Sequence, residues 1–388
     1  MLTAEKLDSK TTDHLKIGFD AKRAFFNRSG LGNYSRNLIS ALSVNYKENE
    51  YFLFTPGLKS KVKWSPGENC IIIPPGRKVF KFLGSLWRSK YITEDIVKSG
   101  VSIFHGLSHE LPVGIEKTGV KSIVTIHDVI FLKYPGFYNK IDIEIYKKKL
   151  FHACRVADKI VAISEQTRKD LSELPGINPE KISVIYQGYN TSFLTRLDDD
   201  IKKKIRIRFD LPDRFLLYVG TIEERKNLLG LIKALHITGI KIPLVAIGRK
   251  VEPYFARIDS YIKAHNITNV RFIDTIENHD LVGFYQMAEC FVYPSFYEGF
   301  GIPIIEALAS KVPVITSKGG CFAEAGGPGT IYIDPADPYA LGSEISKVLS
   351  DKELRSWMIS QGKEFIKRFS NENIAFNYMK LYKSWPTT

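Results

Sequence analysis

Residues 290–307, CFVYPSFYEGFGIPIIEA, run from a short apolar segment through a glycine-containing loop into a segment with a helical pattern. Pro303 suits the first turn of a helix over 303–310, where a backbone amide hydrogen has no partner within the helix. Gly299 and Gly301 leave the amides at the start of that helix uncrowded, and the positive end of the helix dipole attracts anions there. The stretch therefore predicts one strand–loop–helix unit of an α/β protein, with an anion site at its turn.

The same alternation of strand and helix extends along the chain in both directions. Short runs of β-branched and aromatic residues are almost continuously apolar, which is typical of parallel strands covered by helices on both faces. We therefore expect α/β architecture with two doubly wound, Rossmann-like units. The runs are 15–19, 51–55, 70–74, 101–104, 122–126, 159–163, 182–186, 214–220, 242–248, 269–273, 290–294, 312–316 and 330–333.

The length of 388 residues is enough for about two domains, each with its own core. Residues 190–212 carry a DDD run followed by KKK and show no strand pattern, so we expect the linker between the domains there. The last hundred residues are strongly helical in pattern, with segments near 338–349, 352–368 and 372–384.

The net charge of +13 favours an acidic partner, which could be nucleic acid, an anionic membrane surface or a phosphorylated small molecule. No nucleic-acid-binding module is recognised, and the basic excess is spread over both halves, so we expect no nucleic-acid partner. The four cysteines lie far apart without metal-ligand spacing, which excludes a zinc ribbon or disulfide framework. Residues 1–16 lack the apolar run of a signal peptide, and no run of about 18 apolar residues occurs, so we expect a cytoplasmic protein, at most peripheral on the inner face of the plasma membrane.

Two carboxylates flank the anion site, with seven residues between them. Glu298 precedes the turn and can point into a cleft at the carboxyl ends of the strands, whereas Glu306 lies one turn inside the helix. A nucleotide sugar carries hydroxyls on both sides of its phosphates, and such a pair would suit it. Taken singly, Glu298 could be a solvated loop residue and Glu306 a partner of the helix dipole.

Glu298 and Glu306 resemble the E-x7-E motif of retaining glycosyltransferases with the GT-B fold, and the chain over roughly 15–385 is similar to glycosyltransferase family four. The resemblance implies two Rossmann-like domains facing each other across a cleft. The acceptor-binding domain would be 1–200, the nucleotide-sugar domain 201–370, and 371–388 a helix that packs back on the first domain.

The resemblance also implies the activity. The enzyme would be a retaining, metal-independent hexosyltransferase with no cofactor, moving a hexose from a nucleotide-diphosphate sugar to a glycan or lipid-linked acceptor. The setting would be cell-surface polysaccharide biosynthesis, such as that of lipopolysaccharide or capsule. Residues 127–135, HDVIFLKYP, look most like members that use GDP-mannose, which favours mannose weakly.

By resemblance, donor binding would fall mainly on the second domain. Glu298 would hold the sugar hydroxyls and Glu306 the ribose, while Arg225, Lys226 and the backbone amides would hold the diphosphate. Thr221 departs from the family, in which many members have an arginine directly after the glycine. The amides belong to Gly299, Phe300, Gly301 and Ile302.

The first domain would contribute a loop and a strand end. Gly30 and Gly32 follow the first strand and could close over the donor, although Ser35 at the third glycine position breaks the dinucleotide-binding fingerprint. His127 and Asp128 end a buried strand, where ligand sites of α/β sheets lie. In the family this histidine approaches the donor sugar.

Three other residues are weaker candidates. His105 also ends a strand, and Ser164 fits a helix N-cap better than a site. Gly188 resembles the family's turn at the domain joint.

A basic stretch, 77–90, alternates cationic residues with aromatic and aliphatic ones. It predicts contact with an anionic membrane surface or a lipid-diphosphate acceptor; alternatively, it is a solvated face whose aromatics pack inward. The basic residues are Arg77, Lys78, Lys81, Arg88 and Lys90.

Three other functions remain open. A sugar-nucleotide epimerase or sugar-phosphate synthase would share the fold, and a non-catalytic nucleotide-binding scaffold would share the site. A dinucleotide oxidoreductase is disfavoured by the broken glycine fingerprint.

Overall fold

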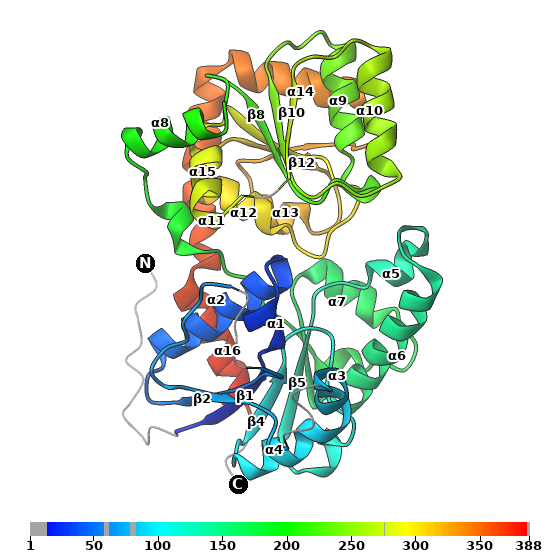
Figure 1. Ribbon diagram of the computed structural model, residues 1–388, viewed down its shortest axis with the longest axis vertical. Coiled ribbons are helices and arrows are strands. Elements are labelled where there is room, and N and C mark those ends of the chain that lie inside the picture. Colours follow the sequence, from blue (N-terminus) through cyan, green and yellow to red (C-terminus); the bar gives the residue numbers. More distant parts are fainter. Residues whose placement is uncertain (1–13, 58–61, 78–82, 275, 386–388) are drawn as a thin grey trace.

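Two parallel sheets form the centres of two lobes (Figure 1) in a computed structural model that describes residues 14–57, 62–77, 83–274 and 276–385. Within these residues the first sheet has seven strands in the order β3-β2-β1-β4-β5-β6-β7, and the second has six in the order β10-β9-β8-β11-β12-β13. The strands are β1 (Lys16–Asp20), β2 (Glu50–Phe54), β3 (Cys70–Ile73), β4 (Ile103–Gly106), β5 (Lys121–Ile126), β6 (Lys159–Ala162), β7 (Ile182–Val184), β8 (Leu216–Val219), β9 (Leu244–Ile247), β10 (Val270–Ile273), β11 (Cys290–Tyr293), β12 (Val314–Ser317) and β13 (Ile331–Ile333).

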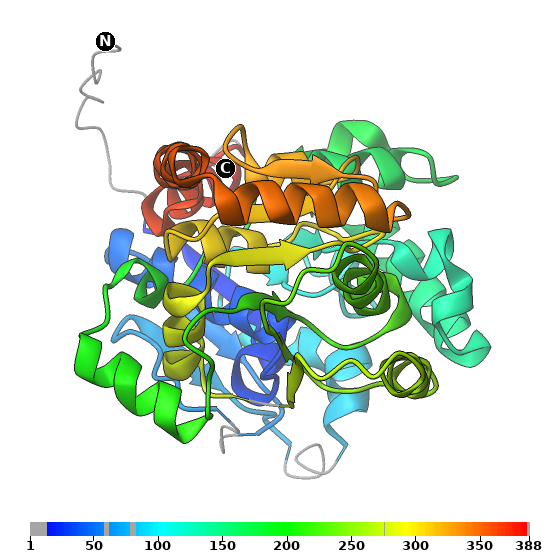
Figure 2. The same cartoon turned by 90° about the horizontal axis from the view of Figure 1, so that it is seen from above.

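Helices connect the strands and cover both faces of each sheet. The predicted fold of two doubly wound α/β domains is confirmed, and Figure 2 shows the second lobe lying over the first. The helices are α1 (Lys22–Phe26), α2 (Gly30–Asn45), α3 (Gly84–Leu86), α4 (Ile92–Lys98), α5 (Ile130–Lys133), α6 (Lys140–Val156), α7 (Glu165–Ser172), α8 (Asp199–Arg208), α9 (Leu228–Ile237), α10 (Tyr254–Ala264), α11 (Asn278–Met287), α12 (Ile302–Ala309), α13 (Phe322–Gly326), α14 (Pro338–Ser350), α15 (Lys352–Phe365) and α16 (Asn371–Tyr382).

The strands are apolar throughout because both of their faces are buried. In β2, Tyr51 and Leu53 belong to one core cluster, whereas Phe52 and Phe54 belong to another. Successive side chains of a strand point to opposite faces, so each strand supplies two cores.

The order of the strands determines where a ligand can bind. The chain reverses its direction of travel across the sheet between β1 and β4 in the first lobe, and between β8 and β11 in the second. Ligands of open α/β sheets bind in the crevice outside the carboxyl ends of strands at such switch points. The loops after β1, β8 and β11 carry most of the predicted site residues.

The last helix returns to the first lobe. α16 packs against α2, and Tyr378, Met379 and Tyr382 are buried in a core cluster of the first lobe (Figure 1). The hydroxyls of Tyr34 in α2 and Tyr378 lie 2.6 Å apart. The chain therefore crosses between the lobes twice, once before α8 and once before α16.

The prediction that the basic residues of 77–90 face an anionic membrane surface is wrong for Arg88. The Arg88 guanidinium is buried and forms an ion pair with Asp20, so it cannot face a membrane. Trp87 is also fully buried, and its indole donates to Asp95 at 2.7 Å. Lys78 and Lys81 lie outside the described residues, and a membrane role for the exposed remainder stays a prediction.

No helix in the described part of the chain combines the length and apolarity that crossing a bilayer would require.

Candidate active site

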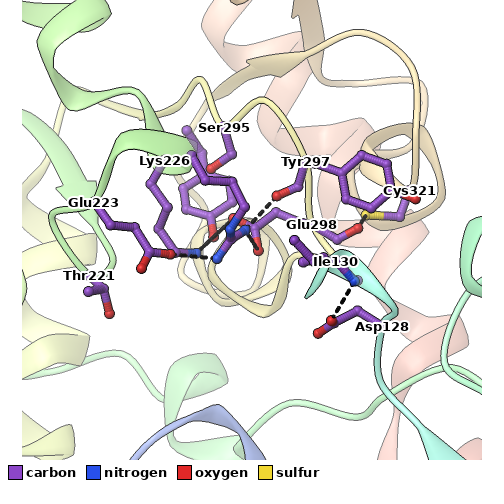
Figure 3. A network of polar contacts seen from close by, with 12 residues as sticks. Asp128, Ile130, Thr221, Glu223, Lys226, Ser295, Tyr297, Glu298 and Cys321 are labelled. Carbon is purple, nitrogen blue, oxygen red and sulfur yellow. Dashed lines mark hydrogen bonds and ion pairs between the residues drawn. The ribbon is translucent and has the colours of Figure 1, made fainter. Parts of the chain in front are cut away.

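Glu298 is the centre of a buried polar cluster in the loop between β11 and α12 (Figure 3). Its Oε1 accepts from Lys226 Nζ at 2.7 Å and from the Tyr293 hydroxyl at 2.9 Å. Its Oε2 lies 2.8 Å from Arg225 Nη1. Burial alone would raise the pKa of this carboxyl, but Lys226 and Arg225 hold it at about 2, so Glu298 is ionised at neutral pH.

The two cations come from a short turn after β8, the 3-10 helix η7 (Glu224–Lys226). Arg225 also pairs with Glu223, with Nη2 and Oε1 2.7 Å apart, and it donates to the Tyr297 carbonyl. Burial alone would lower the pKa of Arg225, but Glu298 and Glu223 raise it. The cluster thus joins the ends of β8 and β11, which are neighbours in the sheet.

Thr221 lies in the same connection but apart from Glu298 (Figure 3). Its carbonyl accepts from the Tyr218 hydroxyl at 3.4 Å and from the Glu223 amide at 3.0 Å.

The predicted helix after Glu298 is α12, and Gly301 is its N-cap with φ 112°, a conformation that favours glycine. Gly299 is required for a different reason, because a Cβ there would lie 2.2 Å from the His127 carbonyl oxygen of the other lobe. The Phe300 ring is buried and stacks on Tyr186 with ring centroids 5.6 Å apart. The Phe300 side chain is therefore not available to a ligand.

Glu306 faces a cavity of about 280 Å³ between the lobes. Gly30 of α2 and Ile302 line the same cavity, so the structure brings these three predicted residues together. The Tyr285 hydroxyl donates to Glu306 Oε2 at 3.2 Å, but burial dominates and raises the pKa of Glu306 to about 8.

Gly32 does not line the cavity. A Cβ at that position would lie 2.0 Å from the Asn27 carbonyl oxygen, so the tight start of α2 explains this glycine.

The His127 side chain is occupied within the first lobe. Its Nε2 lies 2.9 Å from the Leu107 carbonyl, its ring stacks on His109, and burial lowers its pKa to about 3. Its backbone carbonyl, in contrast, faces Gly299. Asp128 lies across from Glu298 in Figure 3, and burial raises its pKa.

His105 is a structural residue. It is fully buried, with Nδ1 2.8 Å from the Tyr382 hydroxyl and Nε2 2.8 Å from the Thr125 hydroxyl.

A contact between the lobes holds the Glu298 loop in place. The hydroxyl of Ser164, the N-cap of α7, donates to the Gly299 carbonyl at 2.7 Å. Glu324 of the second lobe accepts from the first two amides of α7, those of Glu165 at 2.7 Å and Gln166 at 3.1 Å. The N-terminus of α7 is thereby capped by the opposite lobe.

Sequence reasoning missed Tyr293, Glu223 and Glu324. Tyr293 lies in an apolar strand segment that predicts only a core residue, and Glu324 lies about 160 positions from the amides that it caps. No local pattern therefore indicates the role of either residue in the site. Glu223 lies two residues before Arg225 of the predicted clamp, and its acidic side chain so close to that arginine could have indicated the ion pair. In the described part of the chain, no three His, Cys, Asp or Glu side chains are grouped so that they could hold a metal ion.

Two family models match the chain in succession. The model described as Glycosyltransferase Family 4 matches residues 28–193, and the model described as Glycosyl transferases group 1 matches residues 199–365.

Two proteins of Escherichia coli illustrate the similarity in sequence. O-antigen chain mannosyltransferase B is 27% identical over 286 residues, which cover 72% of this chain and 74% of the relative. The serotype-specific mannosyltransferase WbdA is 28% identical over 296 residues, which cover 71% of this chain but only 35% of the relative.

Solved structures share the fold over almost the whole chain. Sucrose-phosphate synthase from Thermosynechococcus elongatus superposes with a TM-score of 0.73 at 21% identity, covering 95% of this chain and 98% of that one. Anabaena HepE, solved in complex with UDP and glucose, superposes with a TM-score of 0.70 at 17% identity, covering 96% of this chain and all of that one.

Proposed function

This chain belongs to the family 4-type glycosyltransferases of the GT-B fold, and from that premise we propose that it is a retaining hexosyltransferase that uses a nucleotide-diphosphate sugar. The acceptor would be a glycan or a lipid-linked glycan in cell-surface polysaccharide biosynthesis. The mannosyltransferases among its relatives support mannose as the sugar. The bound UDP and glucose of HepE support a nucleotide-sugar donor.

The observation that carries the proposal is the cluster of Glu298, Lys226 and Arg225 at the N-terminus of α12. An ionised carboxylate suits the hydroxyls of a sugar, because a charge-assisted hydrogen bond is stronger than a neutral one. The cations and the amides of α12 suit a diphosphate beside it. Glu306 and Gly30, which both line the cavity between the lobes, would then face the ribose end of the donor.

In the reaction that we propose, the bond between the anomeric carbon and the diphosphate oxygen breaks as the acceptor oxygen bonds to that carbon from the same face. The proton of the acceptor hydroxyl passes to the departing phosphate oxygen. Lys226 and Arg225 would stabilise the charge that develops on the leaving group, which is electrostatic catalysis by groups already in place. No cofactor takes part in this scheme.

The contact between the lobes supports exclusion of water from the reaction. Gly299 abuts the His127 carbonyl, and Glu324 caps α7, so the donor loop is held against the first lobe. Exclusion of water would limit hydrolysis of the donor.

We also propose peripheral contact with a membrane through the exposed part of the basic segment. Leu83 and Leu86 are 48% and 38% exposed there, and Lys90 is exposed as well. Arg77 adds less charge, because it pairs with Glu94 at 3.1 Å.

The test is release of nucleoside diphosphate from a panel of nucleotide sugars, including GDP-mannose and UDP-glucose, with and without glycan acceptors. We expect release from one donor that an acceptor accelerates. Conversion of the donor without an acceptor would instead favour an epimerase, and release from no donor would favour a scaffold. The anomeric configuration of the product, read by proton NMR, tests retention.

A further inference from the structure

Asp170 of α7 is a buried carboxylate whose two oxygens serve different lobes. Its Oδ1 accepts from Gln166 Nε2 at 2.8 Å and pairs with Lys133 Nζ at 2.9 Å, and both partners belong to the first lobe. Its Oδ2 accepts from the hydroxyl of Tyr297, which belongs to the second lobe. The side chain of Asp170 is only 2% exposed, so each of these contacts matters for a charge that water does not reach.

Tyr297 is held at its side chain and at its backbone. Its ring lies against that of Tyr134, with centroids 5.1 Å apart. Burial and the Asp170 carboxylate raise the pKa of Tyr297, so its hydroxyl keeps its proton and donates. The Tyr297 carbonyl accepts from Arg225, and the neighbouring Phe296 amide donates to the Arg225 carbonyl at 2.8 Å. Tyr297 therefore connects the first lobe to the turn that carries the two cations.

Glu298 lies between two residues that α7 binds. Tyr297 precedes it, and on its other side the Gly299 carbonyl accepts from the hydroxyls of Ser164 at 2.7 Å and Thr167 at 3.3 Å. Ser164, Thr167 and Asp170 follow one another at intervals of three residues, which places them along one side of the helix. The first lobe thus fixes the backbone on both sides of Glu298.

The carboxylate and the backbone of Glu298 are held by different lobes. The contacts of the carboxylate with Lys226, Arg225 and Tyr293 all lie within the second lobe. The residues on either side of Glu298 are bound to α7 of the first lobe. Because a displacement of about 1 Å in a reacting site can cost about a hundredfold in rate, the second set of contacts bears on the reaction as well as the first.

We propose that Asp170 is a positioning residue, which acts through Tyr297 to hold the Glu298 loop in the orientation that hexose transfer requires. The proposal rests on the proposed function. Asp170 is distinguished from a residue that only joins the lobes. Glu324 joins them at the amides of Glu165 and Gln166. Asp170 binds the residue next to Glu298 instead.

Tyr297→Phe is the main test, because it removes the hydroxyl that binds Asp170 and keeps the ring that lies against Tyr134. Tyr332→Phe is the matched control. The Tyr332 hydroxyl also donates to a single acceptor, the Gly327 carbonyl at 2.6 Å, but this contact lies wholly within the second lobe. Both tyrosines are half-buried.

Asp170→Asn is the second variant, and the fold should tolerate it because Lys133 keeps its ion pair with Glu173 at 2.7 Å. The single amide oxygen of asparagine cannot serve both Lys133 and Tyr297, so the contact between the lobes is weakened. If Asp170 acts through Tyr297, combining Asp170→Asn with Tyr297→Phe should reduce the turnover number no further than Tyr297→Phe alone.

The probes are GDP-mannose and UDP-glucose for turnover, followed by release of nucleoside diphosphate, and GDP and UDP for binding, followed by calorimetry. On the donor that the wild type converts, we expect Tyr297→Phe to lower kcat about tenfold or more. The Kd of the matching nucleoside diphosphate should stay within about twofold, because the cations and amides that would hold the diphosphate remain. Tyr332→Phe should change neither quantity. A merely structural role for the contact would lower the thermal midpoint without separating kcat from Kd in this way.

Hydrogen exchange of residues 294–302 in the free protein tests the same contact without any activity. We expect exchange there to be about tenfold faster in Tyr297→Phe, to be raised in Asp170→Asn, and to be unchanged in Tyr332→Phe. Unchanged exchange in Tyr297→Phe would overturn the proposal, as would equal kcat values for Tyr297→Phe and Tyr332→Phe, or losses in kcat that multiply in the double variant. A wild type that converts neither donor, in a protein whose loop exchange responds as expected, would contradict the proposed function and leave Asp170 as the residue that orients the Glu298 loop.

Discussion

Replacing Glu298 by Gln should reveal how strongly the Glu298 carboxylate is stabilised by Lys226 and Arg225. A carboxyl pKa of about 2, against the ordinary 4.5, corresponds to about 3 kcal/mol in favour of the ionised form in the folded protein. Because this pKa is lowered on folding, the stabilisation is fully present above pH 4.5 and is lost as the pH falls towards 2. The variant removes it and also leaves Lys226 and Arg225 with one carboxylate fewer.

At pH 7 we expect the thermal midpoint of Glu298→Gln to fall by roughly 6–12 °C, from about 3 kcal/mol in a lobe of this size. The difference from the wild type should shrink steadily as the pH is lowered from 5 to 3. Scanning fluorimetry across this pH range measures both quantities, and Glu353→Gln, at an exposed position of α15, is the control. A midpoint difference that stays constant with pH, or no difference at pH 7, would refute the coupling of Glu298 to the two cations.

Three other substitutions test the second carboxylate and the contact between the lobes. Because the pKa of Glu306 is raised to about 8, its burial should cost the wild type stability progressively as the pH rises from 4.5 through 8, and Glu306→Gln should flatten that decline in the thermal midpoint. Gly299→Ala places a Cβ 2.2 Å from the His127 carbonyl oxygen, so it should push the lobes apart and slow hexose transfer by about a hundredfold or more. A transfer rate near that of the wild type would show that the loop does not need this contact. Glu324→Gln weakens the cap on two amides of α7 and should raise the radius of gyration measured by X-ray scattering, whereas an unchanged radius would mean that the cap does not hold the lobes together.

The architecture was predictable because the sequence pattern that indicates it, a short apolar run for each buried strand, is local and recurs along the chain. Each buried parallel strand is a short apolar run, and β2 shows why, since its alternate residues enter two different cores. The strand–loop–helix unit that contains α12 was also predictable, because Glu298, Gly301 and Pro303 lie within a few residues of one another.

What the sequence could not predict depends on long-range packing. Arg88 sits in a basic stretch, yet it pairs inside the first lobe with Asp20, which lies 68 residues earlier. Gly32 looks like a phosphate-binding glycine, but the Asn27 carbonyl explains it. Glu324 and Tyr293 have no local motif, and only the folded chain brings them to α7 and Glu298.

The most direct test of the central claim is acceptor-dependent release of nucleoside diphosphate by the wild type and by Lys226→Met. Lys226 contacts Glu298 in the free protein and would neutralise the departing diphosphate, so its loss should slow transfer by about a hundredfold or more while the protein stays folded. Equal rates for the two proteins on the same donor and acceptor would show that the cluster around Glu298 is not where the hexose is transferred.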